Sequence, residues 1–144
     1  MSVAIVRRSD FDVGDIIRRS EVAKIPDVRK KLGQWLRMSE EVWVGLWDDE
    51  VACVWGLVPP SITSNRAHLW LLTTDIVAEH KFIFIRKSQL VIEDALKRYD
   101  ALVGQVALGN FAAKRWLTWL GAVFGPPEMG FWPFIIRRKE WHLQ

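Results

Sequence analysis

The stretch GNFAAKRWLTWLG, residues 109–121, contains the strongest local indication of the fold. Asparagine favours the start of a helix and glycine its end, so Asn110 and Gly121 predict a short helix between them. Its residues divide into an apolar face and an opposite polar face: Ala113, Trp116, Leu117 and Leu120, with Trp119 at the edge, against Lys114, Arg115 and Thr118. We expect this helix to be chiefly a wall against a sheet.

The rest of the chain alternates between patterns typical of strands and of helices. Runs of β-branched and aromatic residues predict strands at 3–7, 42–47, 51–57, 67–74, 101–108, 122–125 and 131–138, with residues 48–50 as a hairpin turn. Helical spacing predicts helices from Ser9 to about Arg19, from Pro26 to Met38 and over 81–98, although 82–85 could also be extended. The expected fold class is α/β (α+β), with a mixed, mainly antiparallel sheet of six to seven strands and about four helices.

Composition restricts the class of protein. At 144 residues and 50% hydrophobic, residues 1–144 suit one compact domain with its own core. Neither a signal peptide nor an apolar run of about 20 residues is present, so we expect no membrane span and no secretion. A net charge of +3 makes nucleic acid an unlikely partner, and a basic DNA-associated protein is the third alternative. Nine tryptophans indicate an aromatic core or a surface that meets another protein.

This order of elements resembles the GNAT superfamily of acyl-CoA-dependent N-acetyltransferases. Asn110, Ala113 and Gly121 match the pattern that follows the fifth strand in that superfamily. A narrower resemblance is to the small GNAT-like proteins of short-tailed bacteriophages described as internal virion protein A. It rests on Trp70 with Thr73, Thr74 and Asp75, and on Trp116 with Trp119, Leu120 and Gly121. The resemblance implies phage structural proteins or self-association as partners, and the host cytoplasm, with the virion as a further location.

The resemblance also defines what an active enzyme would need. The pyrophosphate of CoA would sit on backbone N–H groups in a glycine-rich turn before the long helix, but residues 72–88 contain no glycine. The general acid, usually a tyrosine, would stand where this chain has Leu117, and the single tyrosine, Tyr99, lies elsewhere. Candidates for the base are found near the turns and helix starts: Glu50, Asp75, Glu79 and His80. We expect no catalytic residue and no cofactor.

Other chemistries have less support. The three histidines have no spacing with Cys53 or with acidic residues that would build a metal site: His68, His80 and His142. No residue lies in the glycine-flanked turn of a serine nucleophile. The sequence therefore predicts no metal.

The favoured interpretation is a catalytically degenerate GNAT-fold protein that acts through protein–protein contacts in a phage particle or its assembly. Pro133 suits only an edge strand or a bulge, and we expect an edge strand here. The aromatic and basic residues near it are expected to bind the partner: Trp132, Arg137, Arg138 and Trp141. The alternative is an active acyl-CoA-dependent N-acetyltransferase with a non-standard CoA-binding loop. In that case acetyl-CoA would be held by Leu72, Thr73, Arg86, Lys87 and Asn110.

Overall fold

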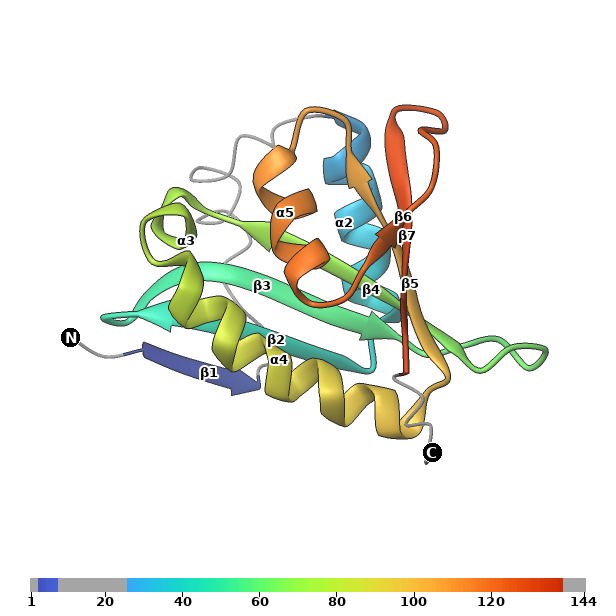
Figure 1. Ribbon diagram of the computed structural model, residues 1–144, viewed down its shortest axis with the longest axis horizontal. Coiled ribbons are helices and arrows are strands. Elements are labelled where there is room, and N and C mark those ends of the chain that lie inside the picture. Colours follow the sequence, from blue (N-terminus) through green and yellow to red (C-terminus); the bar gives the residue numbers. More distant parts are fainter. Residues whose placement is uncertain (1–2, 8–25, 139–144) are drawn as a thin grey trace, which may run out of the picture.

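The computed structural model describes residues 3–7 and 26–138. The predicted helix from Ser9 to Arg19, together with Trp141 and His142, lies outside these residues. In the described part a seven-stranded sheet carries helices on both faces (Figure 1). The predicted fold class, a mixed and mainly antiparallel sheet flanked by helices, is confirmed.

The strands follow the order β1-β2-β3-β4-β5-β7-β6 across the sheet. Every neighbouring pair is antiparallel except β4 and β5, which run parallel. The run 67–74 is apolar on both faces, which predicts a central strand. The corresponding strand β4 is indeed the fourth of the seven. The strand bounds are β1 Val3–Arg7, β2 Glu41–Trp47, β3 Glu50–Val58, β4 Arg66–Thr73, β5 Ala101–Ala107, β6 Val123–Phe124 and β7 Phe131–Arg137.

Four helices lie in the described part of the chain: α2 Pro26–Met38, α3 Asp75–Glu79, α4 Lys81–Arg98 and α5 Phe111–Trp119. The segment 82–85 is helical, with Phe84 and Ile85 buried and Phe82 and Ile83 exposed, which is helical rather than strand periodicity. Helix α3 was not predicted, because five residues are too few to show a helical period. None of the described helices is long and apolar enough to cross a membrane.

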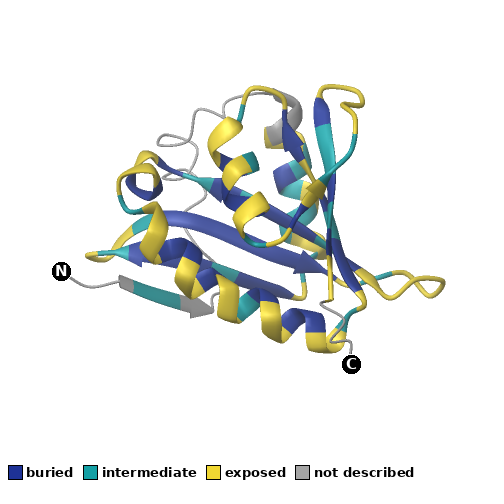
Figure 2. Ribbon diagram, in the orientation of Figure 1, coloured by how far each residue is buried: buried dark blue, intermediate teal, exposed yellow. Residues whose placement is uncertain are grey.

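Two apolar layers hold the sheet, one on each face. Alternate residues of β3 and β4 face α3, α4 and α5 on one side, as Trp55 and Leu69 do, while Val54 and Trp70 join Leu32 of α2 on the other. Figure 2 shows the sheet as largely buried and the outward faces of α4 and α5 as exposed. The helices therefore position their inner faces against one continuous floor.

The hairpin between β2 and β3 is tighter than predicted. Its turn consists of Asp48 and Asp49, both at positive φ (47° and 67°), which is the left-handed conformation that aspartate tolerates. Glu50, expected in the turn, is the first residue of β3 and pairs with Trp47.

The prediction that the C-terminal strand is an edge strand is wrong, because β7 lies between β5 and the two-residue β6. The Gly125 N–H donates to the Pro133 carbonyl at 2.9 Å on the β6 side. In an extended strand the nitrogen and carbonyl of one residue face the same side, so the hydrogen that proline lacks would also face β6. Proline is tolerated here because it removes no bond to β5.

The parallel strands β4 and β5 pair only over Arg66–His68 and then separate, as Figure 1 shows. Gly104 lies next to the point of separation. A Cβ added there would clash with the Leu69 carbonyl oxygen and the Phe134 ring, so only glycine lets the two strands approach this closely. The separation creates the gap over which α5 lies.

Candidate functional site

Helix α5 begins and ends where its sequence predicts, and it forms one wall of the site. The Asn110 side-chain oxygen accepts a hydrogen bond from the Ala113 N–H at 3.2 Å, and Gly121 follows the helix with φ at 101°. Trp116 and Leu117 are 4% and 1% exposed, whereas Trp119 is 63% exposed. The helix is therefore a wall on its inner side and an exposed aromatic edge at its end.

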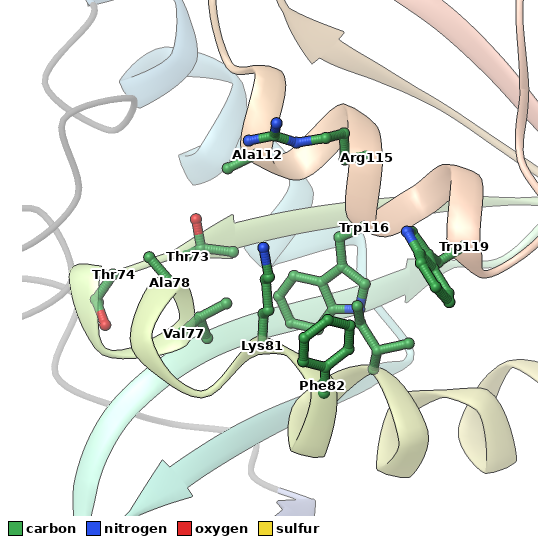
Figure 3. Close-up of a pocket in the computed structure, with 11 residues that line it drawn as sticks. Thr73, Thr74, Val77, Ala78, Lys81, Phe82, Ala112, Arg115, Trp116 and Trp119 are labelled. Atoms are coloured by element: carbon green, nitrogen blue, oxygen red, sulfur yellow. The ribbon is translucent and has the colours of Figure 1, made fainter.

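A pocket of about 310 Å³ lies between α5 and the segment that joins β4 to α4. This volume is at the lower end of the range of small-molecule sites. Figure 3 shows the lining side chains, which come from the end of β4, from α3, from the first turns of α4 and from α5. They are Thr73, Thr74, Val77, Ala78, Lys81, Phe82, Ile85, Ala112, Arg115, Trp116 and Trp119.

Two basic side chains reach this pocket from different elements. Lys81 begins α4 and Arg115 lies on α5, and in Figure 3 both extend towards the opening between α3 and α5. No described carboxylate forms an ion pair with either side chain, and none lines the pocket. The described lining of the pocket is therefore electropositive.

Aromatic rings form the remainder of the pocket mouth. The rings of Phe82 and Trp119 meet edge to face, with centroids 6.1 Å apart, although each residue is more than half exposed. Trp116 lies deeper, and its indole nitrogen has no hydrogen-bond partner in the described structure.

The gap between the separating ends of β4 and β5 is almost filled. It measures about 20 Å³, which is room for about one water molecule. Leu117, Ala113 and Phe134 are among the residues that line it. The inner gap is thus nearly closed, while the outer pocket is open.

The backbone of β4 faces this gap. The Thr74 N–H donates to the Ala52 carbonyl at 2.8 Å, so this pair belongs to the hydrogen-bonded positions of the β3–β4 ladder. Because an antiparallel ladder alternates, the backbone groups of Leu71 and Thr73 point away from β3, towards β5. These two residues lie beyond the part of β4 that β5 pairs with.

The structure brings together only some of the residues proposed for acetyl-CoA. Thr73 lines the outer pocket, and Leu72 and Asn110 line the inner gap. Arg86 and Lys87 are exposed on α4 and line neither. Arg115 also lines the pocket, although its sequence pattern predicts only a position on the polar face of α5. On a helix it lies beside Trp116, about 100° away, so it borders the same pocket.

The candidate bases do not line the pocket or the gap. Glu50, Asp75 and Glu79 are exposed, and His80 stacks on the Trp47 ring with centroids 3.6 Å apart. Tyr99 follows the far end of α4, and burial raises the pKa of its hydroxyl.

Cys53 is fully buried, which raises the pKa of its thiol and makes it unreactive. Among the described residues no cluster of histidine, cysteine, aspartate and glutamate could hold a metal ion.

The residues proposed for partner binding differ in how they are engaged. Trp132 contacts the Phe111 ring and lies 4.2 Å from the Lys114 ammonium, whereas Arg137 is exposed. Arg138 donates to the carbonyl oxygens of Leu96 and Tyr99 at 2.6 Å and 3.2 Å, so it caps the C-terminal end of α4. Arg138 thus has a structural role within the chain.

No protein-family model and no curated protein matches the sequence. Solved structures do match its fold. An acetyltransferase of Bacillus subtilis in complex with CoA superposes with a TM-score of 0.69 at 11% identity, over 96% of this chain and 100% of that one. An IAA acetyltransferase from Bacillus cereus gives 0.70 at 10% identity, over 95% and 100%.

A third similar structure is a GNAT family acetyltransferase from Elizabethkingia anophelis with acetyl-CoA bound, which gives a TM-score of 0.67 at 9% identity over 94% of this chain and 98% of that one. Identities this low relate folds rather than activities. The chain has the fold of the GNAT acetyltransferases.

Proposed function

We propose that this chain is a catalytically degenerate GNAT-fold protein that acts by binding, as a component or assembly factor of a bacteriophage particle. Its contacts are with phage structural proteins or with further copies of itself.

The main support for the loss of catalysis is that Leu117, a buried leucine, stands where a general acid is needed. The resemblance places the general acid here, but leucine has no proton to donate, and it is 1% exposed on the inner face of α5. Among the described residues the pocket lining has no carboxylate, histidine or tyrosine that could take over.

The connection between β4 and α4 does not fit the usual cradle for the CoA pyrophosphate. Helix α3 occupies it, and every residue from Leu72 to Ser88 carries a Cβ that would crowd a phosphate at the backbone. The inner gap of about 20 Å³ also leaves no room for an extended arm of the cofactor. We therefore assign no reaction step to CoA.

The second candidate is an acyl-CoA-dependent N-acetyltransferase with a non-standard binding loop. It is favoured by the outer pocket with Lys81 and Arg115, and by the backbone of Leu71 and Thr73 that faces the gap. Movement of Leu117 and Phe134 would be needed to open that gap.

The phage role is supported by the tryptophan-containing motifs around Trp70 and Trp116 and by the exposed aromatic residues near the site, Phe82, Phe111 and Trp119. Exposed aromatic residues are typical of surfaces that meet another protein.

Two measurements test the proposal. Purified protein mixed with acetyl-CoA and a panel of amines is expected to release no thiol above the blank, and release that depends on an amine would contradict the loss of catalysis. Peptides of this chain should be found in purified particles or assembly intermediates of the phage that encodes it. Their absence from both would contradict the assembly role.

A further inference from the structure

We propose that the pocket between α4 and α5 binds a carboxylate carried on an aromatic or branched aliphatic group. This inference rests on the proposed binding role and adds the chemical class of the ligand.

The charge of the pocket selects an anion. Lys81 and Arg115 line it from opposite sides, and no described carboxylate pairs with them. Lys81 also opens α4, whose 18 residues place the positive end of the helix dipole at this position. A carboxylate in the pocket would gain hydrogen bonds to a charged donor, the Lys81 ammonium or the Arg115 guanidinium, and such bonds are stronger than neutral ones.

The remaining lining selects an apolar group attached to that anion. Val77, Ile85 and Trp116 form the deeper part, and the Phe82 and Trp119 rings stand at the mouth. An apolar group seated there would cover aromatic surface that is otherwise exposed to water.

The size of the pocket argues against a nucleotide cofactor and for a small group. Its 310 Å³ has no extension inward, because the neighbouring gap measures only about 20 Å³. The glycine-free connection gives phosphates no backbone cradle, whereas the Lys81 and Arg115 side chains can bind a carboxylate without one.

The test uses 3-phenylpropionate as the probe and 3-phenylpropanamide as its uncharged match. Titration is followed through the indole N–H signals in a ¹H–¹⁵N spectrum, with the Trp116 and Trp119 signals assigned by the variants Trp116→Phe and Trp119→Phe. We expect the acid to shift these two signals with a Kd on the order of 1 mM, a normal affinity for a fragment. The amide should bind at least about threefold more weakly.

Matched variants locate the site. Lys81→Gln and Arg115→Gln should each weaken the acid by about threefold to tenfold. Lys87→Gln and Arg86→Gln remove the same charges from α4 outside the pocket and should leave the affinity unchanged. Equal weakening by both sets, equal binding of acid and amide, or no shift up to about 10 mM acid would overturn the proposal.

Further probes show whether the carboxylate belongs to a protein chain or to a small organic acid. They also distinguish a failure of the carboxylate proposal from a failure of the proposed function. A phenylalanine-containing peptide with a free C-terminus, and the same peptide amidated but carrying an internal aspartate, should each shift the same signals if the natural source is a protein chain. If only the free acid does so, the source is a small organic acid. Inorganic phosphate that binds more tightly than the acid would overturn the carboxylate assignment. Release of CoA in the thiol assay would instead overturn the proposed function.

Discussion

Glu41 and Arg98 form a two-point ion pair between β2 and the last turn of α4. The guanidinium donates to the two carboxylate oxygens at 3.1 Å and 2.9 Å, and Glu41 is only 8% exposed. This contact raises the pKa of Arg98. Together with the hydrogen bonds from Arg138, this pair helps to fix the far end of the helix whose beginning lines the pocket.

Replacing Glu41 with Gln should lower the free energy of unfolding by about 1 to 2 kcal/mol, a value reduced because Arg98 is 39% exposed and screened by water. Urea unfolding measures this loss. Asp94→Asn is the control, because that carboxylate is 67% exposed and 3.5 Å from Arg98, and its effect should be close to zero. Equal effects of the two variants would contradict the assigned role of Glu41.

Titration of the His68 ring is expected to make the stability of the fold depend on pH. Burial, together with the charge of Lys31, lowers the pKa of its ring below the usual 6.5. As the pH falls below about 6.5, the unfolded chain therefore takes up a proton that the folded chain refuses, and stability falls by up to about 1.4 kcal/mol per pH unit. The loss stops once the pH is below the pKa in the folded state.

The variant His68→Phe keeps a ring against Trp35 but cannot titrate. Chemical unfolding of the variant from pH 8 to pH 5 should show a smaller loss of stability over this window than the native chain shows. Identical pH profiles for the two proteins would refute the assignment.

Helix α5 contains one buried and one exposed tryptophan, Trp116 and Trp119. Trp116→Ala should cost about 3 to 5 kcal/mol, because it removes a ring that is 4% exposed and leaves a cavity. Trp119→Ala should cost less than about 1 kcal/mol, because that ring is 63% exposed. Thermal or urea unfolding compares the two variants, and small, equal losses would mean that α5 is not a wall.

Most elements could be predicted from local patterns. Helix α2, helix α4, the β2–β3 hairpin and the cap of α5 all appear where residue spacing and turn chemistry indicate. Helix α3 could not be predicted, because it has five residues. The edge position given to β7 failed because the pairing of β6, only two residues long, depends on the sheet and not on its own sequence.

At the scale of the whole molecule, topology creates the site. Lys81 and Arg115 lie 34 positions apart in sequence and line one pocket because α5 lies beside the start of α4. No local pattern encodes that proximity. The acetyl-CoA residues proposed from the sequence therefore include Thr73, which lines the pocket, and Arg86 and Lys87, which do not, and they omit Arg115. The partner surface stays a prediction.

Deletion of the C-terminal segment tests whether this part of the chain binds the partner. Deleting residues 139–144 should abolish association with the partner or with further copies, and leave the melting temperature unchanged, because Arg138 and its contacts to α4 remain. Size-exclusion chromatography with light scattering and a thermal melt measure the two effects. A truncated chain that melts lower, or that associates as before, would contradict the prediction.

The most direct test of the account is the thermal stability of the native chain with millimolar acetyl-CoA. We predict no change in the melting temperature beyond that caused by an equal concentration of ATP, because the connection before α4 offers no phosphate cradle and the inner gap is nearly closed. A ligand at a hundred times its Kd would stabilise the fold by about 2.7 kcal/mol. Stabilisation of that size by acetyl-CoA and not by ATP would contradict the claim that this GNAT-fold chain no longer uses the cofactor.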